Sequence, residues 1–91
     1  MKLESLVGYV IAYKDECGIT VYVKYDGLEL SEVEVTGDLL EAIKFETFEE
    51  AKTQLKYYVD NKMIELRYVT GKKLWIEEVT MKSYVAEEFE F

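Results

Sequence analysis

A single helix-forming segment divides this chain into two groups of strand-like segments. Thr47-Phe48-Glu49-Glu50 has the pattern of a capping box, in which the threonine hydroxyl accepts a hydrogen bond from the Glu50 amide and the glutamate reaches back. Apolar residues then recur at helical spacing along one face as far as Asp60-Asn61, where we expect the helix to end. The apolar residues of that face are Phe48, Ala51, Leu55, Tyr58 and Val59.

Three strand-like runs precede the helix. Residues 6–13 are rich in β-branched and aromatic residues, and residues 19–25 alternate between apolar and polar positions after a turn at 15–18. The third run covers residues 28–36, and its apolar phase shifts near Ser31-Glu32, so we expect a β-bulge there. Residues 37–44 are ambiguous and compatible with a short helical turn.

Two strand-like runs follow the helix. Ile64, Leu66 and Tyr68 alternate as a fourth strand, residues 70–73 form a turn, and residues 74–81 form a fifth strand with a bulge or edge at Glu77-Glu78. The order β-β-β-α-β-β predicts an α+β fold: a single twisted antiparallel sheet of about five strands with one helix packed on one face. Because the length allows one hydrophobic core, we expect residues 1–91 to form a single domain.

The C-terminal tail, residues 84–91, alternates glutamate with phenylalanine. Phe89 and Phe91 need apolar cover, so the tail either packs on this chain's own sheet, adds as a strand to a second subunit, or docks in a partner. A tail without such cover is loose. The sequence leaves these alternatives open.

The negative charge is concentrated in one segment. The chain carries 19 acidic and 11 basic residues, which gives a net charge of −8. Segment 26–50 holds nine acids and one base, Lys44, so it accounts for the whole imbalance. A field of one sign repels nucleic acid and attracts basic partners. The same charge also serves solubility, as on an ordinary solvated face.

Glu32 and Glu34 are the centre of the candidate binding surface. If both lie on one strand, their side chains share a face about 6.6 Å apart, which is comparable to the phosphate spacing along a nucleic-acid strand. We therefore expect this surface to dock into a basic groove of a nucleic-acid-binding protein, with neighbouring acids extending the row. The candidate partner-binding residues are Asp26, Glu29, Glu32, Glu34, Asp38 and Glu41.

The residue types that are missing exclude several kinds of chemistry. The chain has no histidine and one cysteine, Cys17, so it cannot form Ser-His or Cys-His nucleophile pairs, cysteine–histidine zinc sites or an internal disulfide. We expect no catalytic residues, no metal ligands and no cofactor. No apolar run is long enough for a transmembrane helix, and the single cysteine favours a reducing compartment.

The middle of the chain resembles a group of known proteins. The run that carries the resemblance is Glu41-Ala42-Ile43-Lys44-Phe45-Glu46-Thr47-Phe48-Glu49-Glu50-Ala51, which follows a hairpin and precedes a helix and a closing strand at 74–79. It resembles small uncharacterised proteins encoded by phages and mobile elements of Gram-positive bacteria, over roughly residues 8–80. The resemblance implies a fold and a genomic setting, in the cytoplasm of a bacterial host. Small acidic phage proteins are often inhibitors of host defence or host enzymes, sometimes by imitating DNA. This chain differs by an extra hairpin strand and its acidic tail.

Two functions follow as expectations. The first is a non-enzymatic acidic module that binds a basic protein surface, in its most specific form a phage-encoded inhibitor that mimics nucleic acid and binds no nucleic acid itself. The alternative is a small structural or accessory subunit that forms homodimers or larger homo-oligomers through its sheet edges and tail. Salt separates the two, because docking through exposed charges weakens at high salt and an apolar edge contact persists.

Overall fold

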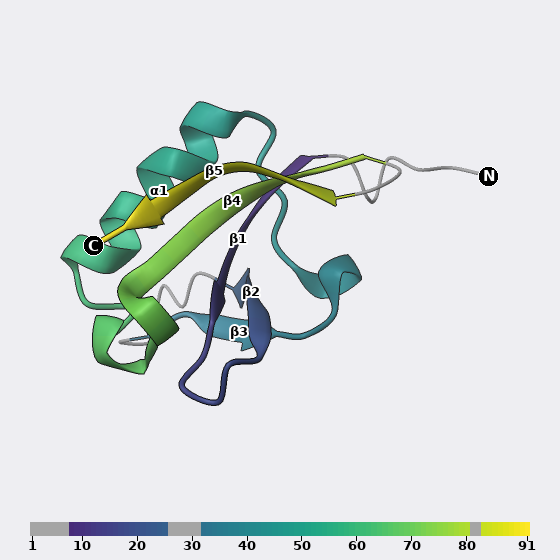
Figure 1. The fold of residues 1–91 in the computed structure, drawn as a ribbon. Helices are drawn as coiled ribbons and strands as arrows, with labels where there is room; N and C mark the ends of the chain where they lie inside the picture. The colour runs from purple at the N-terminus through teal and green to yellow at the C-terminus, as the bar shows by residue number, and fades with distance from the viewer. Residues whose placement is uncertain (1–7, 26–31, 81–82) are drawn as a thin grey trace.

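The described part of the chain forms one antiparallel sheet with one α-helix packed on it. The computed structural model describes residues 8–25, 32–80 and 83–91. Its strands are β1 (Gly8–Lys14), β2 (Thr20–Tyr25), β3 (Glu34–Thr36), β4 (Lys73–Val79) and β5 (Ser83–Glu90), and its α-helix is α1 (Phe48–Asp60). The strands lie in the order β3-β2-β1-β4-β5, and α1 packs against β1 and β4 (Figure 1). The predicted fold class, a single antiparallel sheet of five strands with one helix on one face, is confirmed.

Helix α1 begins and ends where the sequence predicts. The Thr47 hydroxyl accepts a hydrogen bond from the Glu50 amide at 3.1 Å, and the Glu50 carboxylate accepts one from the Glu46 amide at 3.3 Å. Asn61 caps the other end, where its side-chain amide donates to the Tyr57 carbonyl at 2.8 Å. Both termini therefore satisfy backbone groups that lack intrahelical partners.

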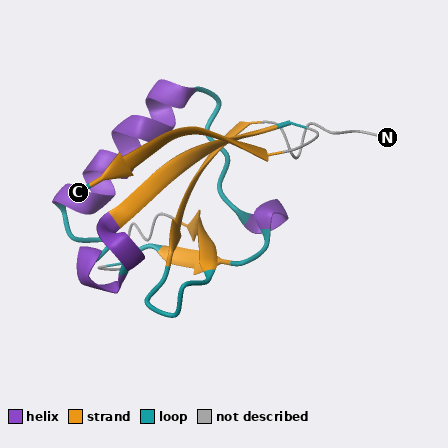
Figure 2. Cartoon of the chain, in the orientation of Figure 1, coloured by secondary structure: helices purple, strands orange, loops and turns teal. Residues whose placement is uncertain are grey.

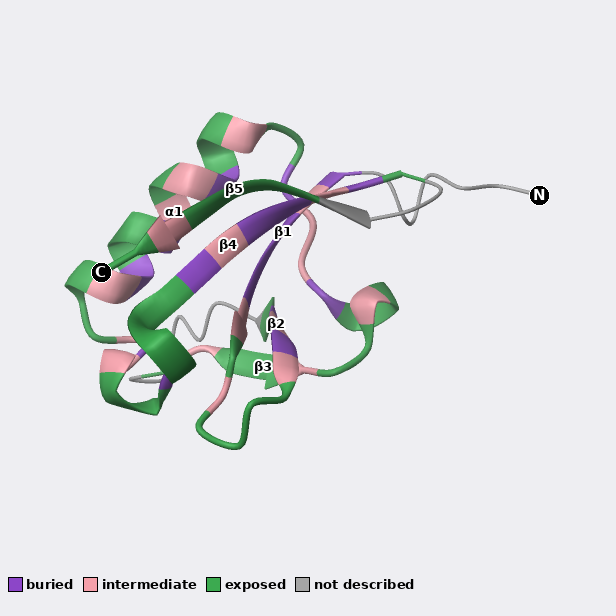
Figure 3. Ribbon diagram, in the orientation of Figure 1, coloured by how far each residue is buried: buried purple, intermediate pink, exposed green. Residues whose placement is uncertain are grey.

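The core lies between α1 and the face of the sheet that it covers. Ala51, Leu55 and Tyr58 of the helix are buried and pack with residues of the sheet. The sheet residues of this core are Ile11, Val23, Leu74 and Ile76. Figure 3 shows buried segments on both β4 and α1; of the buried β4 residues, Leu74 and Ile76 pack with α1, whereas Val79 packs on the other face of the sheet. The apolar residues that recur at helical spacing on α1 and those that alternate along the strands therefore pack into one core.

The predicted strand at residues 64–68 is wrong. Residues Leu66–Tyr68 form a 3₁₀ helix, η3, followed by a second one, η4 (Thr70–Lys72), at the predicted turn. The amides of Tyr68 and Val69 donate to the carbonyls three residues earlier, so these bonds replace a strand ladder. Three alternating apolar residues are too short a signal to fix a strand when the local turns satisfy the backbone. The purple segments of Figure 2 outside α1 include these short helices.

The C-terminal tail packs on this chain's own sheet. Strand β5 pairs with β4 along its whole length, from Ser83 opposite Val79 to Glu90 opposite Lys73. Phe89 lies opposite Leu74 and packs against the core. The β4–β5 register shifts between Ile76 and Glu77, beside the predicted bulge at Glu77-Glu78, but the extra residue is Ala86 of β5. The tail is therefore the fifth strand of the sheet. It pairs with β4, the strand that the sequence predicted to form a hairpin with residues 64–68.

The third strand is shorter than the predicted run within the described residues. β3 contains Glu34–Thr36, and the Val33 amide bonds to the Met63 carbonyl instead of the sheet. Residues 28–31 lie outside the described residues, and with them half of the predicted bulge at Ser31-Glu32. The β2–β3 register does shift, between Val23 and Tyr25.

Gly8 starts β1 at a point of close backbone contact. Tyr9 and Phe45 exchange two backbone hydrogen bonds, at 2.8 and 2.9 Å, which hold the chain after η2 (Leu39–Glu41) against the start of β1. Gly8 has φ +142°, and a Cβ there would lie 3.0 Å from the Phe45 carbonyl oxygen. Only glycine adopts this conformation and leaves this space without strain.

We expect Gly8→Ala to lower the free energy of unfolding by about 1–3 kcal/mol, since it adds both backbone strain and a steric clash. Urea denaturation followed by circular dichroism measures this. Gly37→Ala is the matched control, because a Cβ at Gly37 meets nothing within 4 Å. Equal stability of the two variants would show that the Tyr9–Phe45 contact does not constrain Gly8.

Candidate functional site

The candidate acidic surface lies around the edge strand β3 and the helix η2 that follows it. Glu32, Glu34, Asp38 and Glu41 are all exposed. The other two candidate residues, Asp26 and Glu29, lie outside the described residues. We call the four described residues the β3 acids.

Glu32 and Glu34 do not share the strand geometry that the sequence predicts. Glu34 is the first residue of β3 and pairs with Tyr25, whereas Glu32 lies in a bend before the strand. Between the two glutamates, the Val33 amide donates to the Met63 carbonyl at 3.1 Å and not to the β2 ladder. The spacing of residues on one strand therefore does not apply to this pair.

Local hydrogen bonds tie the other two acids to the end of β3. Asp38 accepts from the Leu40 amide at 2.9 Å and so caps η2. Glu41 accepts from the Thr36 hydroxyl at 2.8 Å, and the same hydroxyl accepts from the Asp38 amide at 3.0 Å. Thr36 thus links both acids to β3. These bonds hold Asp38 and Glu41 at the end of β3, the strand that begins with Glu34.

Lys44, the only base of segment 26–50, is directed to the backbone. Its ammonium donates to the carbonyls of Leu39, Leu40 and Ala42 at 2.9, 3.2 and 3.0 Å. Burial lowers the pKa of Lys44, and the charge of Asp38 partly opposes that shift. The ammonium therefore closes the loop after η2 and is not displayed among the exposed acids. It holds in place the segment that carries Asp38 and Glu41.

A second cluster lies on the other face of the sheet and was not predicted. The register places Thr36, Tyr22, Ala12, Trp75 and Glu88 in one row across all five strands. The Trp75 indole N–H donates to the Glu77 carboxylate at 2.8 Å, and Glu77 is only 7% exposed. Burial raises the pKa of Tyr22, with a smaller contribution from the charge of Glu77.

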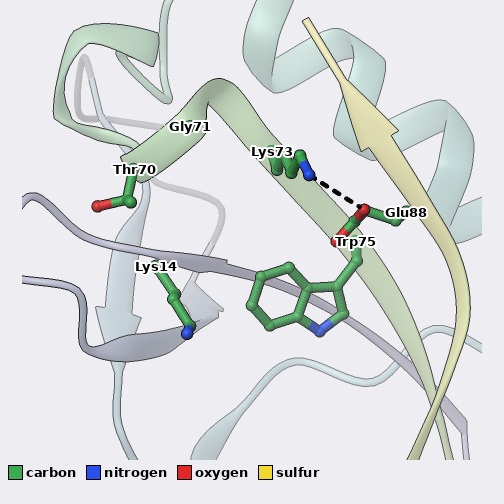
Figure 4. A pocket seen from close by; sticks show the side chains of 6 residues that line it. All are labelled: Lys14, Thr70, Gly71, Lys73, Trp75 and Glu88. Atoms are coloured by element: carbon green, nitrogen blue, oxygen red, sulfur yellow. Dashed lines mark ion pairs between the residues drawn. The ribbon is translucent and has the colours of Figure 1, made fainter.

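A pocket of about 310 Å³ opens beside the indole of Trp75 (Figure 4). Its lining residues come from β1, the η4 turn, β4 and β5: Lys14, Thr70, Gly71, Lys73, Trp75 and Glu88. The one signal in the sequence was the pair Trp75 and Glu77, two residues apart and hence on one strand face. The contributions of β1 and β5 depend on strand pairing, which sequence spacing does not reveal.

Comparison with family models, curated proteins and solved structures gives no match for this chain. The resemblance to phage proteins therefore remains an expectation from the sequence. Among the described residues, no group of three or more metal-ligating side chains is placed to hold a metal ion. No helix within those residues has the length and apolar character needed to cross a membrane.

We expect Lys44→Met to lower the free energy of unfolding by about 1–2 kcal/mol, because three carbonyl groups lose their charged donor. Chemical denaturation measures the loss. Lys56→Met removes the same charge from the exposed face of α1 and is expected to change stability little. If the two variants were equally stable, the three bonds of Lys44 would contribute nothing to the fold.

The raised pKa of Tyr22 predicts a loss of stability in alkali. The unfolded chain releases this proton near pH 10, while the folded chain still holds it, so the free energy of unfolding falls as pH rises above about 10. We expect Tyr22→Phe to make this decline shallower in denaturation series at increasing pH. Tyr57→Phe removes an exposed hydroxyl of α1 and controls for the loss of one tyrosine. An unchanged slope in Tyr22→Phe would contradict the prediction.

Proposed function

We propose that this chain is a non-enzymatic binding module whose β3 acids dock on a basic surface of another protein. One observation carries the proposal: the exposed acids surround one sheet edge, and the only base of their segment, Lys44, is bound to backbone carbonyls. Within the described residues, Lys44 feels the charge of Asp38 but forms no ion pair with a β3 acid, so the surface keeps most of its negative charge. Such a surface attracts and orients a basic partner.

The hydrogen bonds of Asp38 and Glu41 favour this use of the surface. Each carboxylate accepts a local bond, so its position is fixed before a partner arrives. A fixed side chain loses less conformational entropy on binding than a freely rotating one. Each carboxylate also keeps further acceptor sites for an arginine or lysine of the partner. The loop thus holds the carboxylates of Asp38 and Glu41 in fixed positions after the strand that begins with Glu34.

A more specific form of the proposal is nucleic-acid mimicry. In that form the β3 acids take the place of phosphates and occupy a basic groove of a host protein that handles nucleic acid or defends against phages. The concentration of negative charge in one segment supports this reading, as does the resemblance of residues 41–51 to phage proteins. The module would then act as a stoichiometric inhibitor in the bacterial cytoplasm.

The alternative, a structural subunit that assembles through its sheet edges, has weaker support. The tail is already paired with β4, and the β5 edge carries the exposed carboxylates of Glu87, Glu88 and Glu90. A second copy paired along β5 would bring these like charges together, which opposes strand pairing. The exposed side chains of Val85 on β5 and of Phe91, just after β5, favour self-association.

The test compares captured partners between two variants of equal charge. We would immobilise the wild-type chain, Glu32→Gln/Glu34→Gln, and the control Glu16→Gln/Glu87→Gln, whose sites are exposed and lie on other elements. Bacterial lysate is passed over each, followed by washes of rising salt and mass spectrometry. We expect to capture a basic protein that elutes at moderate salt, because many exposed charge pairs are screened together. The control variant should retain this protein, and the β3 variant should lose it because two of the contacting charges are removed.

Two results would overturn the proposal. One is a partner that binds the β3 variant and the control equally, which would place the contact elsewhere. The other is capture only of further copies of this chain, stable at high salt, which would favour the structural alternative. The solution mass of the free chain, measured alongside, separates self-association from partner binding.

A further inference from the structure

Hydrogen bonds fix part of the wall of the pocket beside Trp75. The indole N–H is bonded to the buried Glu77, which sets the orientation of the ring. The Thr70 hydroxyl donates to the Asp15 carbonyl at 2.6 Å, and the Phe91 amide donates to the Lys72 carbonyl at 2.9 Å. These bonds tie the η4 turn to the end of β1 and to the end of β5. A preformed cavity of this kind is typical of small-molecule sites.

The two lysines of the pocket differ in their partners. Lys73 lies 3.9 Å from Glu88 and 3.7 Å from Glu90, so two carboxylates neutralise it. The Lys14 side chain is exposed, and its ammonium forms no ion pair or hydrogen bond within the described residues. Figure 4 shows the six-membered ring of Trp75 turned toward Lys14, with Lys73 and Glu88 on the far side of the indole. The pocket therefore offers one free cation beside an aromatic wall.

The geometry points to a binding site for a flat aromatic monoanion, such as an aromatic carboxylate. The ring of the ligand would pack on the Trp75 indole, as aromatic pairs prefer offset or edge contacts, and its carboxylate would pair with Lys14. Glu88 disfavours a second negative group at the other side of the pocket, so polyanions such as nucleic acid fit poorly. The volume of about 310 Å³ lies at the lower end of the range for ligand pockets.

This site is separate from the β3 acids. Its residues come from β1, η4, β4 and β5, and none of them belongs to segment 26–50. The inference therefore does not depend on the proposed function, and either can fail without the other. It also gives a role to the hydrogen-bonded pair of Trp75 and the buried Glu77, which docking through β3 leaves unused.

The chain contains one tryptophan, so a single indole N–H resonance reports on the pocket. We would label the chain with ¹⁵N and titrate it with 2-naphthoate while following that resonance. The expected result is a saturable shift. The neutral analogue 2-naphthamide, which keeps the ring, and acetate, which keeps the charge, are both expected to bind more weakly, because each lacks one of the two contacts.

Lys14→Met tests the cation directly. It removes one exposed charge contact, so we expect the dissociation constant for 2-naphthoate to rise about two- to fivefold. Lys56→Met is the control, since this exposed lysine lies on α1, across the sheet from the pocket, and its affinity should equal that of the wild type. The inference is overturned if no saturable shift occurs, if 2-naphthamide binds as tightly as 2-naphthoate, or if Lys14→Met binds like the control.

Discussion

The burial of strand β1 on both faces is the constraint on which the rest of the structure depends. Val10, Ile11 and Ala12 are consecutive and have no exposed surface. Ile11 faces the core under α1, while Val10 packs on the other face with Ala42 and Val79. Since consecutive strand residues point to opposite faces, the sheet needs a cover on each side. Helix α1 covers one side, and the segment around Ala42 covers part of the other.

This second cover determines where both candidate surfaces lie. The Phe45 backbone is bonded to Tyr9 of β1, and the Ile43 amide donates to the Val23 carbonyl of β2 at 2.9 Å. These bonds fix the loop that Lys44 closes, and so they fix Asp38 and Glu41 beside β3. The cover does not extend over Trp75, where the open face leaves a pocket. The segment around Ala42 thus covers only part of the sheet face opposite α1. It places the acids beside β3, and it leaves the pocket at Trp75 uncovered.

The sequence predicts the local elements well and the long-range ones less well. The capping box of Thr47 and the apolar face of α1 depend on residues a few positions apart, so spacing alone identifies them. Apolar residues alternate at 64–68 as they would in a strand, but the backbone hydrogen bonds of this segment are those of a 3₁₀ helix. The strand that replaces it, β5, depends on a register with β4 that no local pattern specifies. Likewise, the acids of segment 26–50 are visible in the sequence, whereas the pocket combines residues that lie up to 74 positions apart, from Lys14 to Glu88.

Three lysines show why net charge is a poor guide to what this surface binds. Lys44 donates to three carbonyls, Lys73 lies between two carboxylates, and Lys14 has neither kind of partner among the described residues. All three carry the same formal charge, and two of them, Lys14 and Lys73, line the pocket, but of these Lys14 alone has no carboxylate beside it among the described residues. A chain with a net charge of −8 can therefore attract a cationic partner at one sheet edge and hold a small anion elsewhere. Exposed charges act mainly over about one Debye length, roughly 8 Å in physiological salt. The electrostatic potential at each surface therefore depends more on the nearest charged residues than on the net charge of the chain.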